Sequence, residues 1–133
     1  MSKSHFIIEQ ISRFTFEVTV DKIVKEAEKR GWNVPATHNL QKSLAKSGKA
    51  VRPVTVIEIC KPEYSGQMLE LNHERIMSVM MPCRISVYVK DDGKTYTALI
   101  NGAELSAGQP EKIVKVMKAA SDETMEIVKT VAG

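Results

Sequence analysis

Two cysteines, Cys60 and Cys83, are the only thiols of this 133-residue chain, and each lies beside a proline. A basic residue, Lys61 or Arg84, follows each thiol, and nearby positive charge favours a reactive thiolate. The two segments are IEICKP (57–62) and MPCRI (81–85). Such a pair suits redox chemistry, a soft-metal site or a ligand pocket, and the sequence leaves the three open.

Cys60 follows a run rich in β-branched residues, 54–59, which predicts an interior strand. Pro62 suits the first position of a helix, which we expect to run to about residue 71. A helix start offers unpaired N–H groups and a partial positive charge. Ligands in open α/β sheets gather at the carboxyl ends of strands. The sequence therefore predicts a pocket at this end of the sheet, with a plain packing role for Cys60 as the competing interpretation.

Strand direction decides whether the two sulfurs meet, because Cys60 closes one strand and Cys83 opens another. Parallel strands would put the thiols at opposite ends of the sheet, and antiparallel strands would put them at the same end.

A trans peptide is expected before Pro82, since cis X–Pro bonds are uncommon.

The expected pocket wall includes a possible anion partner, because the Arg84 guanidinium offers a fixed positive fork. The occupant could be a small anionic molecule, a metal or haem. The candidate ligand-binding residues are Cys60, Lys61, Pro62, Pro82, Cys83, Arg84 and His38. A metal could use Cys60, Cys83, His38 and His73, although the cysteine spacing fits no zinc finger, and haem could use a cysteine, His5, His38 or His73.

Two other interpretations compete with the binding protein. In the first, Cys60 is the activated thiolate and Cys83 the resolving thiol of a redox protein or thiol-dependent enzyme. In the second, the chain is a structural dimeric subunit with packing cysteines. No nucleophile elbow, phosphate loop, dinucleotide fingerprint or HExxH motif occurs, so whether the protein is an enzyme stays open.

Composition sets the class of molecule. Hydrophobic residues make up 43% and charged residues 26%, as expected for one globular domain spanning residues 1–133. No apolar run could span a membrane, and no secretory signal is found, which predicts a cytoplasmic protein. The net charge of +3 argues against a nucleic-acid partner. Residues 29–57 lack acidic side chains and carry six basic ones, which we interpret as a solvated face rather than an anion site.

Hydrophobic periodicity predicts nine elements. Residues 14–20 fit either an alternating strand or a helix, and we favour the helix because Gly31 can end it. The expected elements are strand 5–13, helix 16–30, extended segment 32–38, helix 40–47, strand 54–59, helix 62–71, strands 85–89 and 96–100, and helix 109–130. The order β-α-β-α-β-α-β-β-α predicts an α+β two-layer sandwich with one mixed or antiparallel sheet.

Three methionines, Met77, Met80 and Met81, cluster before Pro82. Flexible thioethers suit a dimer interface, a pocket lip or ordinary core. A Cu(I) site with Cys83 is imaginable on ligand type, and we do not favour it from the sequence.

These residues together carry a resemblance. The segments in question are GW (31–32), THNL (37–40), EICKP (58–62), MMPCRISVY (80–88) and DGK (92–94). Their order resembles the domain-of-unknown-function 302 family over about residues 5–130, in a two-cysteine branch. The resemblance implies a small two-layer α+β fold and a homodimer. It brings no catalytic residues, because the activity of the family is not known.

Overall fold

The computed structural model describes residues 6–133. Its centre is one five-stranded sheet with strand order β1-β5-β4-β3-β2, antiparallel at every pairing. The strands are β1 (Ile7–Ile11), β2 (Asn33–Asn39), β3 (Val54–Cys60), β4 (Cys83–Val89) and β5 (Thr95–Ile100). Of the two sheet types left open by the sequence, the antiparallel one is therefore correct.

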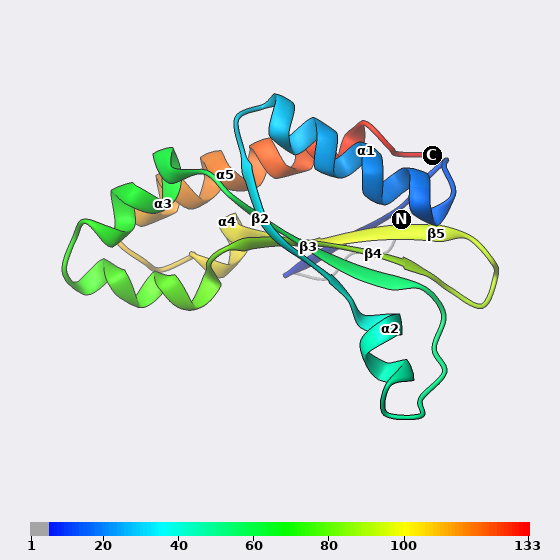
Figure 1. Ribbon diagram of the computed structural model, residues 1–133. Coiled ribbons are helices and arrows are strands. Elements are labelled where there is room, and N and C mark those ends of the chain that lie inside the picture. The colour runs from blue at the N-terminus through cyan, green and yellow to red at the C-terminus, as the bar shows by residue number, and fades with distance from the viewer. Residues whose placement is uncertain (1–5) are drawn as a thin grey trace.

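Two long helices cover one face of this sheet (Figure 1). The helical elements are α1 (Phe16–Lys29), α2 (Leu40–Ala45), α3 (Pro62–Leu69), the 3-10 helix η1 (His73–Met80), α4 (Gly102–Leu105) and α5 (Glu111–Lys129). The helices α1 and α5 lie above the sheet, whereas the short α2 projects on the other side (Figure 1). The predicted α+β two-layer sandwich is confirmed.

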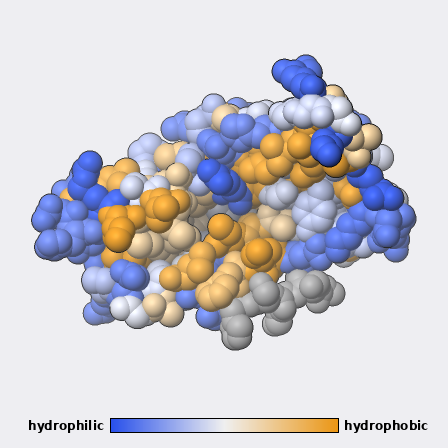
Figure 2. Space-filling view, turned by 90° about the horizontal axis from the view of Figure 1, so that it is seen from below, coloured by the Kyte–Doolittle hydropathy of each residue, from blue (hydrophilic) through white to orange (hydrophobic). Residues whose placement is uncertain are grey.

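Alternation along the strands builds the core. Ile57 and Ile59 of β3, and Ile85 and Val87 of β4, have no exposed surface and point toward the helices. The intervening residues, such as Val56, lie on the opposite face, which α1 and α5 do not cover; we call it the open face. Figure 2 views the molecule from this side and shows several apolar patches among polar side chains.

The helix predicted at 16–30 forms, rather than the alternative strand, because its buried face packs Ile23 and Ala27 into the core. It ends before Gly31, whose φ of 85° is unfavourable for other residues. Pro62 opens α3, as predicted. The first strand is shorter than expected, covering Ile7–Ile11; the expected start at residue 5 lies outside the described residues.

Two elements were not predicted, η1 and α4. A 3-10 turn has no 3.6-residue repeat to detect, and α4 has only four residues. The side chain of Asn101 caps α4 by accepting a hydrogen bond from the Glu104 amide. Both elements matter for the site, because they stand beside the end of the sheet where the cysteines lie.

No helix within residues 6–133 is long and apolar enough to cross a bilayer.

Candidate functional site

The antiparallel pairing of β3 and β4 brings the two cysteines to the same end of the sheet. Cys83 pairs in register with Ile59, and Cys60 is the next residue of β3. Both thiols are free and half-buried. Antiparallel strands were the condition for both thiols to lie at the same end of the sheet, and this condition is met.

Two adjoining cavities lie at this end. The inner cavity holds about 40 Å³ and reaches Cys60, Lys61, Tyr64 and Cys83. The outer cavity holds about 120 Å³ and reaches Cys83, Arg84, Ile100 and Thr124. The wall between them is shared by Met80, Met81, Pro82, Cys83, Met117 and Ala120. The expectation of a trans bond in this wall is wrong: the Met81–Pro82 peptide is cis.

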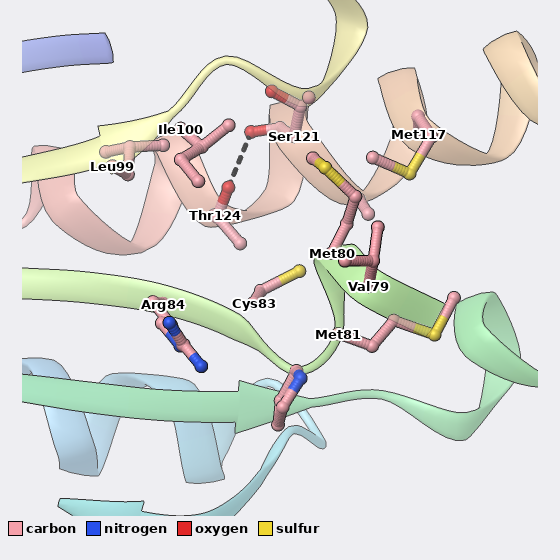
Figure 3. Close-up of a pocket in the computed structure, with 13 residues that line it drawn as sticks. Val79, Met80, Met81, Cys83, Arg84, Leu99, Ile100, Met117, Ser121 and Thr124 are labelled. Atoms are coloured by element: carbon pink, nitrogen blue, oxygen red, sulfur yellow. Dashed lines mark hydrogen bonds between the residues drawn. The ribbon is translucent and has the colours of Figure 1, made fainter. Parts of the chain in front are cut away.

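Cys83 stands in the shared wall and points toward the side on which Met80 and Met117 lie (Figure 3). Burial, together with a smaller contribution from the nearby Cys60, raises the pKa of its thiol to about 11. The Cys83 side chain is consequently a neutral thiol at neutral pH. Its surroundings are those of a packing or ligating sulfur rather than an activated nucleophile.

Cys60 borders the inner cavity at the junction of β3 and α3. Its sulfur lies 3.7 Å from the Ser65 hydroxyl oxygen, a weak polar contact. The Ser65 hydroxyl itself donates to the Lys61 carbonyl oxygen at 3.4 Å. Cys60 therefore keeps its sulfur available to an occupant of the cavity.

A half-buried carboxylate joins three residues that line the inner cavity. Glu123 of α5 accepts hydrogen bonds from the Lys61 ammonium at 2.6 Å, the Trp32 indole at 2.8 Å and the Tyr64 hydroxyl at 2.5 Å. Lys61 also donates to the Arg30 carbonyl oxygen at 3.1 Å. The positive charge expected to act on Cys60 is thus engaged by Glu123.

Electrostatics follow from these contacts. Burial of the Glu123 carboxyl opposes its ionisation, but hydrogen bonds from Lys61, Tyr64 and Trp32 outweigh burial and lower its pKa below 4.5. The hydrogen bond to Glu123 raises the pKa of Tyr64 to about 12. At neutral pH Glu123 is therefore a carboxylate and Tyr64 a neutral phenol.

The other predicted site residues lie outside the lining of the inner cavity. Arg84 is exposed and borders the outer cavity, and no side-chain hydrogen bond or ion pair joins its guanidinium to another residue among 6–133. Its register partner on β3, Glu58, bonds instead to His38, with 2.8 Å between Nε2 and Oε2. His38 and Pro62 line neither cavity.

Metal ligation by the predicted histidines gains no support from the geometry. Over residues 6–133, no three or more His, Cys, Asp or Glu side chains converge as a metal site. His73 is exposed at the start of η1. The haem candidate His5 lies outside the described residues.

Sequence reasoning missed the residues that complete the site: Trp32, Tyr64, Met68, Met117 and Glu123. One signal was present. Glu123 comes three residues after Ala120 and four before Ile127, so it falls on the apolar stripe of α5. A carboxylate at a core-facing helical position needs a buried partner, and it could have been flagged on that ground.

The comparisons with known proteins agree with this architecture. A family model described as "Domain of unknown function DUF302" matches residues 8–131. The chain belongs to this family. The crystal structure of an uncharacterized conserved DUF302 protein from Bacillus stearothermophilus superposes with a TM-score of 0.86, covering 96% of this chain and 99% of that one. At 15% identity, that likeness concerns the fold of the DUF302 domain alone. No curated protein matches the chain.

Proposed function

We propose that this DUF302 protein is a binding protein that holds a small ligand at the cysteine end of its sheet. One observation carries the proposal: two adjoining cavities share a wall containing Cys83, and each reaches a different predicted site residue, Cys60 or Arg84. Apolar walls with few polar groups are typical of ligand sites.

The outer cavity favours an anionic ligand. Arg84 borders this cavity from the open face, with its side chain turned away from Met80 and Met117 (Figure 3), and it has no ion-pair partner among the described residues. The neighbouring carboxylate, Glu58, is occupied by His38. A guanidinium presents several donors in one plane, which matches a carboxylate or an oxyanion. The remaining lining is apolar apart from the buried hydroxyls of Ser121 and Thr124.

The ligand must be small. Volumes of about 120 and 40 Å³ lie below the roughly 300 Å³ at which pockets for drug-sized ligands begin. An ion or a short carboxylate, phosphate or sulfur oxyanion fits this space. Haem, which the sequence left as a candidate, is therefore not part of the proposal.

A thermal-shift titration with phosphate, sulfate, sulfite and short carboxylates tests this proposal. A ligand that binds only the folded chain raises its melting temperature by mass action. We expect at least one anion to do so, and Arg84→Ala to abolish the shift. Ala120→Leu, which enlarges a side chain in the shared wall, should do the same. The matched control is Arg52→Ala, which removes an exposed arginine elsewhere. Equal shifts in all variants would refute an Arg84-dependent site.

Thiol redox chemistry is the second candidate, favoured by the antiparallel strands that bring Cys60 and Cys83 to one cavity. The two thiols would transfer two electrons and two protons to an oxidant such as glutathione disulfide. A Cys60–Cys83 bond would form as the oxidant is cleaved to two thiols. Mass spectrometry after glutathione disulfide treatment should then find an intramolecular disulfide. Mixed disulfides alone, or no reaction, would count against this candidate.

The homodimer implied by the family resemblance remains a proposal, and we assign its interface to the open face. This face carries Val54, Val56, Ala98 and Ile100, the last of which is 45% exposed and borders the outer cavity. A second copy would cover this apolar surface. Light scattering should give a dimer mass for the wild type and a monomer for Val56→Glu; a wild-type monomer would exclude this assembly.

A further inference from the structure

Sulfur is concentrated around the inner cavity. Both cysteines of the chain and four of its seven methionines border this space of about 40 Å³. The six are Cys60, Met68, Met80, Met81, Cys83 and Met117. They come from β3, β4, α3, η1 and α5, so the fold gathers them from segments far apart in the chain.

Several of these sulfurs lie on one side of β4. The Cys83 thiol points to the side of the strand where Met80 and Met117 stand, whereas Arg84 turns away from them (Figure 3). Cys60 reaches the same inner cavity from the end of β3. Residues from the ends of two neighbouring strands, Cys60 and Cys83, therefore border the inner cavity.

Water is a poor occupant of this space. A buried water needs two to four polar partners. The polar groups of the rim already bond one another: Lys61 and Tyr64 donate to Glu123, and Ser65 donates to the Lys61 carbonyl. With its charge balanced by Glu123, Lys61 also offers little repulsion to an entering cation.

The chemistry of the lining selects among metals. Hard and borderline ions such as Mg²⁺, Ca²⁺ and Zn²⁺ favour carboxylate, imidazole or several thiolate ligands. No such group of three His, Cys, Asp or Glu side chains exists within residues 6–133. Thiolates and thioethers are instead the ligands preferred by Cu(I).

We propose that the inner cavity binds one Cu(I) ion, with Cys60 and Cys83 as thiolate ligands and methionine thioethers completing the site. Binding forms Cu–S bonds to both cysteines and to the methionine thioethers, releases the two thiol protons to solvent and moves no electrons. The inference rests on the proposed function, because it assigns a ligand to the same end of the sheet. It concerns the inner cavity rather than the anion site of the outer one.

An anaerobic titration of the reduced full chain with Cu(I), in competition with bicinchoninate, tests the proposal. We expect one equivalent per chain. Either Cys60→Ser or Cys83→Ser should weaken Cu(I) binding by at least about 100-fold. Loss of a residue that only supports a metal ligand already costs up to about 100-fold in affinity, and loss of a ligand should cost no less. The Met80→Leu/Met117→Leu double variant should weaken it less. The matched control is Met125→Leu, which removes a thioether packed against the main core and outside the cavity.

A second measurement needs no cysteine substitution. Bound Cu(I) should protect both thiols of the wild type from iodoacetamide, as read by mass spectrometry. Copper that stays with the chelator, or one-equivalent binding retained by a Cys60→Ser/Cys83→Ser double variant, would overturn the proposal. Arg52→Ala, at an exposed arginine that lines neither cavity, should leave Cu(I) affinity unchanged. If Cu(I) does not bind but anions still raise the melting temperature in an Arg84-dependent way, this inference is wrong and the proposed function is retained.

Discussion

Two ends of the same sheet carry nearly the same polar unit. At the cysteine end, Glu123 accepts hydrogen bonds from Lys61 and Tyr64. At the hairpin end, Glu9 accepts hydrogen bonds from Lys90, at 3.0 Å, and from Tyr88. Each unit joins a carboxylate, an ammonium and a phenol from different elements.

The surroundings of the two units differ. The inner cavity beside Glu123 is small and lined by thiols and thioethers. The groove beside Glu9 holds about 580 Å³ and is bordered by Lys90 and Tyr96, whose polar atoms are engaged by Glu9 and Asp92. The comparison teaches that a carboxylate–lysine–tyrosine cluster does not by itself mark a site. The cysteine end is distinguished by its concentration of sulfur and by Arg84.

The largest expected effect is on stability. Glu123→Ala leaves Lys61, whose side chain is only 16% exposed, without its counter-charge. We expect a loss of about 3 kcal/mol in the free energy of unfolding. Glu9→Ala should lose only about 1 kcal/mol, because Lys90 is 42% exposed and can be solvated. Urea unfolding measures both free energies. Equal losses in the two variants would contradict the predicted difference between the two clusters.

Thiol reactivity gives the next largest effect. With a pKa of about 11, only about one Cys83 side chain in a thousand is a thiolate at pH 8. We expect iodoacetamide to modify Cys83 at least about tenfold more slowly than a free cysteine in a peptide of the same sequence. Peptide mapping against that unfolded control measures the ratio. Modification at the rate of the free peptide would show that Cys83 is not buried in the shared wall.

Acid should weaken both carboxylate clusters. The Tyr88 hydrogen bond lowers the pKa of Glu9, and hydrogen bonds at Glu123 lower that pKa despite burial. Both contributions to stability are complete above the unfolded pKa of about 4.5 and are lost as pH falls through the lower folded values. Urea unfolding across this range should become less pH-dependent in Glu9→Gln and Glu123→Gln. If either variant keeps the pH dependence of the wild type, the lowered pKa of the glutamate that it replaces is contradicted.

The smallest effect is expected at Arg84. Because Arg84 is exposed and no described residue pairs with it, Arg84→Ala should change stability by less than about 0.5 kcal/mol. Urea unfolding checks this figure beside Arg52→Ala. A larger loss would mean that Arg84 supports the fold, and it would weaken its assignment as an anion partner.

Local patterns in the sequence were enough for most of the fold. The β-branched run at 54–59, the hairpin around Gly93 and the apolar stripe of α5 each specify an element without long-range information. Alternation was detected only from residue 85, yet β4 begins at Cys83, because pairing with Ile59 extends the strand. Pairing between distant segments leaves no local repeat to detect.

The site was harder to predict for the same reason. The cysteines were identified from their types and neighbours, but their meeting depended on the direction of β4. Lys61 and Glu123 are 62 residues apart, so their ion pair follows only from the packing of α5 beside α3. His38 looked like a ligand by residue type, and its partner Glu58 became apparent only in the β2–β3 register.

Native mass spectrometry of the wild-type chain, purified anaerobically without added ligand or reductant, tests the central claim most directly. The account predicts an excess mass, from an anion or a copper ion, that is absent in Cys83→Ser, since Cys83 belongs to the wall of both cavities. Glu9→Gln, at the hairpin end, should keep that mass. A bare and fully reduced wild-type protein, or an excess mass unchanged in Cys83→Ser, would contradict a ligand site at the cysteine end.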